Sequence, residues 1–258
     1  MNKYPAFFFG HGSPMNAILD TEFSREWKKI GKNLEKPKAI IAISAHFETQ
    51  KTQLTAMQNP HTIYDFSGFP DELYNVKYEM KGSEEIAQKI ITDLKEYNIF
   101  PNYSWGIDHG VWSILKFLFP DIGDILVLEL SLDITKSPKE HFEFAQKLSY
   151  LRNEGYFILG SGNIVHNLYK MDWYNENASF DWAKEVNESV KNMLLSGDIE
   201  SLINFRKLGP KFDMAIPTRE HFLPLLYIYA LKSGDENIEF FNDKIVSGSL
   251  SMTSFKIS

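Results

Sequence analysis

The sequence contains no cysteine among its 258 residues. Disulfide bonds, thiolate zinc sites and a cysteine nucleophile are therefore excluded, and any bound metal must be held by histidine, aspartate or glutamate. The absence of cysteine also fits a reducing compartment, so we expect a cytoplasmic protein.

The chain also lacks a long apolar segment and an excess of basic residues. No stretch approaches the roughly 20 apolar residues that span a bilayer, and no basic segment precedes an apolar run at the N-terminus. With 34 acidic and 27 basic residues, the formal net charge is -7. This charge argues against a nucleic-acid binder or a polybasic membrane anchor, so we expect a small-molecule ligand, no nucleic acid and no membrane.

Apolar runs alternate with helical patterns along the chain. The runs are typical of strands buried on both faces of a parallel sheet, and they lie at 7–9, 39–43, 125–132 and 156–159. With no repeat and no linker, this alternation predicts one α/β domain over residues 1–258, with helices on both faces of a central, mostly parallel (mixed) sheet. Since 43% of the residues are apolar and can furnish a full core, we expect a monomer.

Capping residues and apolar spacing predict the helices. We expect them at 21–34, 83–97, 137–155, 180–195 and 218–231, and after Asp108. Ser137-Pro138-Lys139-Glu140 is the clearest start, because it combines a capping box with proline at the first helical position. Gly160 to Asn163 predicts a strand-to-helix turn, and the last twenty residues predict an edge hairpin of two strands. Residues 57–82 form an irregular, aromatic segment that is typical of a lid or binding surface.

Three histidines follow predicted strands. His11 comes after the first strand, His46 after the second, and His166 after the strand at 156–159. Ligands of α/β sheets collect at the carboxyl ends of the strands, so we expect these histidines to lie at one edge. Converging neutral imidazoles suit Zn(II) or Fe(II), and the type of ligand alone does not distinguish the two metals.

The remaining histidines are more ambiguous by pattern. His221 precedes an apolar helix, which fits a ligand and a helix-start residue equally well. His109 lies in the first turn of a helix, where Asp108 could orient it by accepting a ring hydrogen bond. We interpret His141, which has no accompanying motif, as structural, and His61, in the aromatic segment, as a minor candidate for the pocket.

A serine nucleophile is not indicated. Gly160-Ser161-Gly162 lacks the spacing of a nucleophile elbow and the Lys-Ser/Thr pair of a phosphate loop. Hydrolysis by a serine triad is therefore not expected, and the aromatic residues of 57–82 favour a flat aromatic ligand instead.

Seven segments in order carry a family resemblance from residue 7 to residue 252. They are FFFGHGSPMNAI, AISAHFET, IYDFSGFP, WGIDHGVWSIL, GSGNIVHNL, REHFLPLLY and GSLSM. With these segments the chain resembles the class III extradiol ring-cleaving dioxygenases, specifically the 4,5-DOPA extradiol dioxygenase branch. The resemblance implies an oxidoreductase that opens the aromatic ring of a DOPA-like catechol with dioxygen.

The resemblance also implies roles for five histidines. His11, His46 and His221 would bind one nonhaem Fe(II), and Zn(II) fits the same site. His166 would be the acid/base, and would also contact the metal when no substrate is present. His109 would lie beside the substrate or dioxygen pocket.

One departure from the wider superfamily leaves two alternatives open. That superfamily commonly supplies a carboxylate as third ligand, whereas the matching motif here offers His221 with Glu220 beside it. An all-histidine site is less diagnostic of iron. A zinc-dependent hydrolase on the same histidines and a non-catalytic metal-binding scaffold therefore remain alternatives. Oxygen consumption with catechols separates them from the dioxygenase.

Overall fold

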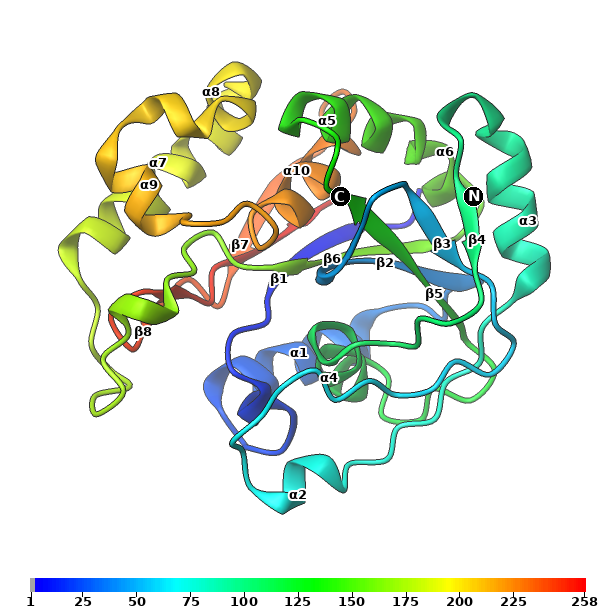
Figure 1. Ribbon diagram of the computed structural model, residues 1–258, viewed down its shortest axis with the longest axis horizontal. Helices are drawn as coiled ribbons and strands as arrows, with labels where there is room; N and C mark the ends of the chain where they lie inside the picture. The colour runs from blue at the N-terminus through cyan, green and yellow to red at the C-terminus, as the bar shows by residue number, and fades with distance from the viewer. Residues whose placement is uncertain (1–2) are drawn as a thin grey trace.

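The computed structural model describes residues 3–258, in which a mixed eight-stranded sheet lies between layers of helices (Figure 1). The strands are β1 (Ala6–Gly10), β2 (Ala39–Thr49), β3 (Gln53–Thr55), β4 (Phe100–Asn102), β5 (Leu126–Asp133), β6 (Phe157–Gly162), β7 (Ile238–Phe241), β8 (Ile245–Val246), β9 (Leu250–Ser251) and β10 (Ser254–Ile257). The sheet order is β4-β3-β5-β2-β6-β1-β10-β7. Its four central strands, β5, β2, β6 and β1, run parallel, which confirms the predicted α/β class.

Helices cover both faces of the sheet. They are α1 (Glu22–Asn33), α2 (Asp71–Tyr74), α3 (Glu84–Asp93), α4 (His109–Leu118), α5 (Pro138–Lys147), α6 (Ser149–Asn153), α7 (Asp181–Ser196), α8 (Ile199–Ile203), α9 (Pro210–Ala215) and α10 (Leu223–Ala230). Short 3-10 helices lie at Pro14–Ala17, Lys95–Tyr97, Leu168–Lys170 and Phe205–Leu208. Helices α1 and α4 lie on one face, and α5, α6 and α10 on the other (Figure 1). Within residues 3–258, no helix is long and apolar enough to cross a membrane.

Predicted capping residues begin and end several helices. Thr21 and Ser24 form a reciprocal capping box at α1, and Ser137 and Glu140 form another at α5. Helix α7 ends where Gly197 takes a left-handed conformation with φ of 76°. Because these signals act within one turn of the helix, the sequence locates them without tertiary information.

Gly160 and Gly162 do not form the predicted strand-to-helix turn. Gly160 and Gly162 remain within β6, and an isolated bridge from His166 follows in place of a helix. A Cβ atom at Gly160 would lie 2.8 Å from the carbonyl oxygen of Pro224, and one at Gly162 would lie 2.2 Å from that of His221. The prediction of a strand-to-helix turn was therefore wrong, because these glycines permit close backbone packing.

Other boundaries also differ from the predictions. The helix predicted at 137–155 is divided into α5 and α6, and the one predicted at 218–231 begins only at Leu223, with Pro224 in its first turn. The last twenty residues contain the predicted antiparallel pair, β7 with β10, but β10 also pairs with β1 and is internal. The connection between β7 and β10 forms the separate β8–β9 pair.

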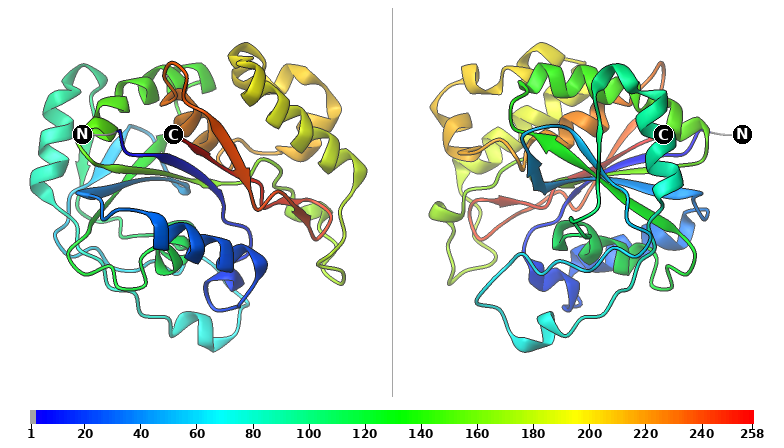
Figure 2. Two further views of the ribbon diagram at one scale, coloured as in Figure 1. Left: turned by 180° about the vertical axis from the view of Figure 1, so that it is seen from behind. Right: turned by 45° about the vertical axis from the view of Figure 1, so that its right-hand side comes forward.

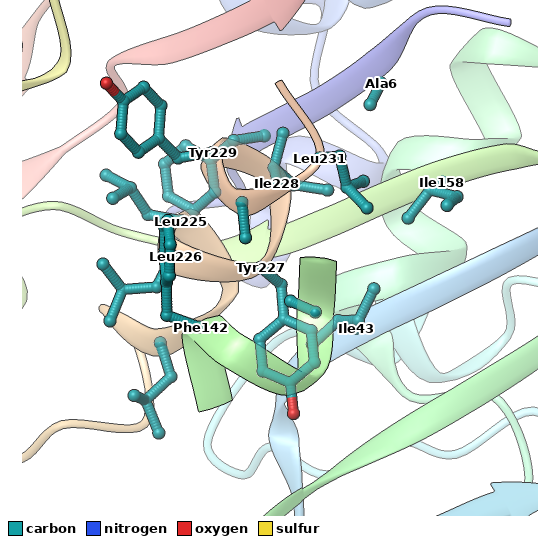
Figure 3. Close-up of a cluster of buried hydrophobic side chains, with 14 of the residues drawn as sticks. Ala6, Ile43, Phe142, Ile158, Leu225, Leu226, Tyr227, Ile228, Tyr229 and Leu231 are labelled. Carbon is teal, nitrogen blue, oxygen red and sulfur yellow. The ribbon is translucent and has the colours of Figure 1, made fainter. Parts of the chain in front are cut away.

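Helix α10 is the centre of the larger hydrophobic core. Every residue from Leu223 to Ala230 is buried, and the helix packs against α5 and the sheet (Figure 3). The hydroxyl of Tyr227 lies 2.8 Å from Nδ1 of His141, whose Nε2 lies 3.1 Å from the carbonyl oxygen of Asp133. His141 thus bonds within the core, in agreement with its structural interpretation.

A buried arginine joins both ends of the chain. The first and last strands of the chain lie side by side, because β1 pairs with β10 and Ala6 is opposite Ile257 (Figure 2). Arg152 is fully buried and donates to the carbonyl oxygen of Tyr4 at 2.7 Å and to that of Leu231 at 3.0 Å. Its Nη2 also donates to Oε1 of Glu236 at 2.5 Å. This ion pair is therefore part of the closure between N- and C-terminal segments.

We expect the Glu236→Gln variant to be less stable, because the buried guanidinium of Arg152 loses a charged partner. Breaking a buried ion pair costs roughly 3–5 kcal/mol, and the partial exposure of Glu236 favours the lower end. Burial raises the pKa of Glu236, but hydrogen bonds from Arg152, Lys3 and Ser233 outweigh burial and lower the pKa to about 2. The stabilisation is therefore complete above the ordinary pKa of 4.5 and is lost as pH falls through about 2.

Thermal unfolding across this pH range tests the expectation. The difference in melting temperature between wild type and variant should be constant above pH 4.5 and shrink below it. Glu239→Gln, which removes an exposed partner of Lys256, is the matched control and should change stability by less than about 0.5 kcal/mol. A difference independent of pH would contradict the assigned contribution of Glu236.

Candidate active site

Five histidines gather at the carboxyl edge of the parallel strands. The ring centroids of His11, His46 and His221 lie 5.0, 5.3 and 5.4 Å apart. His109 lies 4.2 Å from His46, and His166 stacks on His221 at 3.5 Å with an interplanar angle of 6°. The structure thus brings together all five histidines that the sequence analysis singled out as candidates.

The end of β6 connects two of these histidines. His11 follows β1 directly, and its backbone N–H donates to the carbonyl oxygen of Gly162 at 3.1 Å. The N–H of Asn163 donates to the carbonyl oxygen of His221 at 2.8 Å. Backbone hydrogen bonds of the successive residues Gly162 and Asn163 therefore hold His11 and His221 beside the end of β6.

His46 reaches the site through an irregularity within β2. The sequence predicted that the strand ends at residue 43, but β2 continues to Thr49. Its pairing with β5 shifts between Ile43, opposite Leu130, and Glu48, opposite Leu132. Five steps along β2 therefore match two along β5, and such an insertion bends a strand and redirects its side chains. His46 lies inside this insertion, so its position depends on a bulge that the apolar pattern does not reveal.

His109 and His166 come from outside the sheet. His109 is the first residue of α4, and His166 lies beyond β6, where its N–H donates to the carbonyl oxygen of Ala215 at 2.9 Å. His61 does not join them: it lines a separate surface depression near Lys81 and Pro120.

Four of the five rings are oriented by a hydrogen bond at Nδ1. The partners are Ser161 Oγ for His11 at 2.9 Å, Glu220 Oε1 for His221 at 3.0 Å, Asp65 Oδ1 for His109 at 2.7 Å, and Asp65 Oδ2 for His46. Each bond leaves Nε2 as the free ring nitrogen. Histidines that bind metals are commonly oriented in this way, because the outer bond fixes both tautomer and ring direction.

The partner of His109 differs from the prediction. Asp108 occupies the N-cap position of α4, but its Oδ1 accepts a hydrogen bond from Ser44 Oγ at 2.8 Å. Asp65 bonds His109 instead. Asp65 was not predicted as a site residue, although it lies in IYDFSGFP, one of the segments that carry the family resemblance.

The residues present fit a divalent metal ion. Nε2 of His46 is buried and has no hydrogen-bond partner among the described residues, so a metal would satisfy an otherwise unpaired polar atom. Burial lowers the pKa of His11 and of His221 well below the ordinary value, which keeps both imidazoles neutral. Burial also opposes protonation of His46, but the hydrogen bond to Asp65 and the negative charges of Asp65, Asp108 and Glu220 together outweigh it and raise the pKa of His46.

Two groups of ligand atoms lie at this place. Nitrogens of His11, His46 and His109 lie within 4.8 Å of one another, as do ligand atoms of His166, Glu220 and His221. Glu220 lies behind His221 and bonds its Nδ1, so this carboxylate supports a histidine where the wider superfamily commonly uses a carboxylate as ligand.

A cavity of about 500 Å³ opens in front of the histidines. Apolar side chains form much of its wall: Pro14, Phe66, Phe69, Leu168, Met171, Trp173 and Leu250. Phe66 meets the ring of His109 edge-on at 5.3 Å. Among residues 3–258, no lysine or arginine lines the cavity. Its size and walls suit a small, flat aromatic ligand.

Comparison with known proteins decides the family. Residues 5–256 match the model of the catalytic LigB subunit of aromatic ring-opening dioxygenase. The chain belongs to this dioxygenase family. The match confirms the predicted resemblance, and dioxygenases of this family are metal-dependent, in keeping with the histidine-rich site.

Individual relatives of this dioxygenase cover nearly its whole length. It is 41% identical to the 4,5-DOPA dioxygenase extradiol of Escherichia coli K12, over 99% of this chain and 95% of that protein. It is 32% identical to the 4,5-DOPA dioxygenase extradiol of Beta vulgaris, over 100% and 97%. A crystal structure of an uncharacterized Escherichia coli K12 protein matches with a TM-score of 0.87 at 36% identity, covering 99% of this chain and 100% of that one.

Replacement of Gly162 by alanine tests the packing at the end of β6. The added Cβ would meet the carbonyl oxygen of His221 at 2.2 Å, so this backbone must shift. We expect zinc affinity to fall by roughly 10- to 100-fold, the range seen when groups that support a ligand are disturbed.

Gly31→Ala is the control, because its Cβ would meet the carbonyl oxygen of Leu118 at 2.0 Å, between α1 and α4. Both variants should melt at lower temperature, and only Gly162→Ala should weaken zinc binding in a titration of the metal-free protein. Equal zinc affinities in the two variants would show that His221 does not depend on this contact.

Proposed function

We propose that this protein is an extradiol dioxygenase that opens the ring of a DOPA-like catechol with dioxygen. The observation that carries the proposal is the group of five buried or half-buried histidines, four of them oriented at Nδ1, at the base of an aromatic-sized cavity. Membership of the ring-opening dioxygenase family supports it. We further propose that residues 1–258 form one catalytic domain that acts as a cytoplasmic monomer.

His11, His46 and His221 are the proposed ligands of one Fe(II). Their rings are mutually adjacent, and the bonds at Nδ1 leave three Nε2 atoms for a metal. His109 is proposed as a substrate-side residue and not as the third ligand, because its ring meets Phe66 of the cavity wall edge-on. Its nitrogen also lies within 4.8 Å of those of His11 and His46. Bound Fe(II) would carry electrons from the catechol to dioxygen and would offer a positive charge to the catechol oxygens. Zn(II) fits the same nitrogens but has no redox chemistry.

His166 is the proposed base. Burial lowers its pKa to about 4, against the nearby charge of Glu220, so the ring is neutral at physiological pH and can accept a proton from a catechol hydroxyl. Unlike the other four rings, it has no hydrogen bond to another side chain of the described residues, and its polar contact is with its own backbone. His109, oriented by Asp65, lines the same cavity and can return a proton to the product.

The cavity wall excludes water from the substrate ring. Phe66 and Phe69 from one side and Leu168, Met171 and Trp173 from the other surround the space in front of the histidines. A catechol there would exchange water for aromatic and aliphatic contacts, while its two oxygens face the imidazoles. Water exclusion strengthens every hydrogen bond that the histidines make to these oxygens.

Oxygen consumption tests the function. Metal-free protein loaded anaerobically with Fe(II) should consume dioxygen on addition of a catechol and form a yellow ring-opened product, whereas the Zn(II)-loaded protein should not. No product from a panel of catechols, including DOPA, would overturn the proposal. Hydrolysis of esters by the Zn(II) form without oxygen uptake would favour the zinc hydrolase.

Replacement of His166 by alanine separates a base from a ligand. We expect turnover by the Fe(II) enzyme to fall by about 100- to 10,000-fold, the usual contribution of general acid/base catalysis, while bound iron per chain stays near that of wild type. His46→Ala is the comparison variant and should lose iron and activity together. Parallel loss of both in His166→Ala would identify His166 as a ligand instead.

The cavity predicts how the substituent of the catechol affects the reaction. A carboxylate would find no lysine or arginine on the wall formed by the described residues, and an unpaired charged group costs roughly 1–3 kcal/mol or more. We therefore expect kcat/KM for dopamine, which lacks the carboxylate, to exceed that for DOPA by roughly tenfold. 4-Ethylcatechol should resemble dopamine, and 3-(3,4-dihydroxyphenyl)propionate should be the poorest of the four.

A new cation at the cavity should reverse this order. Leu168 lines the cavity and is 47% exposed, so Leu168→Lys can bring an ammonium to the rim. The variant should improve kcat/KM for the two carboxylates alone, and Leu168→Gln should not. A higher kcat/KM of the wild type for the propionate than for dopamine would contradict the expectation that the cavity wall disfavours a carboxylate.

A further inference from the structure

One carboxylate, that of Asp65, bonds two histidines of the site. Its Oδ2 bonds Nδ1 of His46, and its Oδ1 lies 2.7 Å from Nδ1 of His109 and accepts the backbone N–H of the same residue at 3.1 Å. By comparison, Ser161 and Glu220 each bond one ring, that of His11 and that of His221. Asp65 therefore connects a proposed metal ligand with a histidine of the substrate cavity.

The segment that carries Asp65 is held in place on both sides of this residue. Before it, the carbonyl oxygen of Ile63 accepts from Trp112 Nε1 at 2.9 Å, and the hydroxyl of Tyr64 donates to the carbonyl oxygen of Val76 at 2.5 Å. After it, Phe66 packs against His109 and lines the cavity. The carboxylate is thus positioned by packing before any ligand binds.

An ionised carboxylate accepts hydrogen bonds and cannot donate them. Each imidazole that bonds Asp65 must therefore carry its hydrogen on Nδ1, and a neutral ring then keeps the lone pair on Nε2. For His46 this is the buried nitrogen that has no partner among the described residues. The two oxygens of one side chain select the same tautomer in both rings.

We propose that Asp65 is a positioning residue that sets the tautomer and direction of both His46 and His109, and so joins the aromatic segment 57–82 to the metal centre. The assignment of His46 as a ligand and of His109 as a substrate-side residue rests on the proposed function. The effect on His46 concerns metal affinity, which is measurable without turnover.

Asparagine at this position is expected to disturb the site more than glutamate. Asp65→Asn keeps the size of the side chain, but its amide nitrogen replaces one accepting oxygen with a donor. The ring that faces this donor must move its hydrogen to Nε2, where the lone pair is needed. Asp65→Glu keeps two accepting oxygens on a longer side chain. We therefore expect this variant, unlike Asp65→Asn, to retain part of the wild-type metal affinity.

Titration of the metal-free protein with Co(II), followed by visible absorption, tests whether Asp65 affects metal binding through His46. We expect Asp65→Asn to weaken Co(II) affinity by about 10- to 100-fold or to change the ligand-field spectrum, and Asp65→Glu to recover part of the loss. Asp71→Asn, an exposed carboxylate of the same segment, is the matched control and should bind as wild type. Wild-type Co(II) affinity and spectrum in folded Asp65→Asn, checked by circular dichroism and melting temperature, would overturn the proposal.

A double-mutant cycle at saturating Fe(II) tests whether Asp65 affects turnover through His109. If Asp65 acts through His109 once iron is bound, Asp65→Asn should lower kcat in wild type but not further in His109→Ala. Fully additive losses would contradict this side of the proposal. Failure of the proposed function is distinguishable: the wild type would bind Co(II) yet cleave no catechol, and the affinity comparison at Asp65 would still decide whether the carboxylate positions a ligand.

Discussion

The site depends on the close approach of three backbone segments at the end of β6. Gly162 has no Cβ, so the carbonyl oxygen of His221 can pack against this strand, and the carbonyl oxygen of Gly162 accepts the N–H of His11. Residues about 150 and 60 positions away in the chain thereby become neighbours. A larger side chain at Gly162 would separate them, since the packed interior has no free volume at this contact.

The same strand end lies between the two hydrophobic cores of the molecule. On one face, the wholly buried α10 packs against β6 and carries the segment of His221 at its start; on the other, α4 begins with His109. Both helices are held by core packing far larger than any single contact of the site. The histidines are thus presented from rigid elements, which favours a preorganised centre. The aromatic segment 57–82 supplies the part of the site that is irregular in structure, and Asp65 connects that segment to the sheet edge.

Burial and hydrogen bonding have opposing effects on the site histidines. Desolvation favours neutral imidazole at His11, His166 and His221, whereas the carboxylate of Asp65 favours the charged form of His46. A partly desolvated carboxylate costs free energy unless it is paired, and Asp65, whose side chain is 20% exposed, is paired twice. Hydrogen bonds from His109 and His46 outweigh burial and lower the pKa of Asp65. The result is a centre in which burial keeps His11, His166 and His221 neutral and one shared carboxylate lies behind His46 and His109.

The sequence by itself determined what short-range chemistry encodes. Apolar runs and helix caps such as those at Thr21 and Ser137 predicted the α/β class, and ordered motifs predicted the family and the five histidines, because these signals act within a few residues. Only the tertiary structure decided the β2 insertion that redirects His46, the close packing at Gly162 and the partner of His109. Each of these depends on contacts between distant segments: β2 with β5, β6 with the residues before α10, and Asp65 with two histidines. No local pattern records which distant atoms will meet, and for that reason Asp108, next in sequence to His109, was predicted where Asp65 is found.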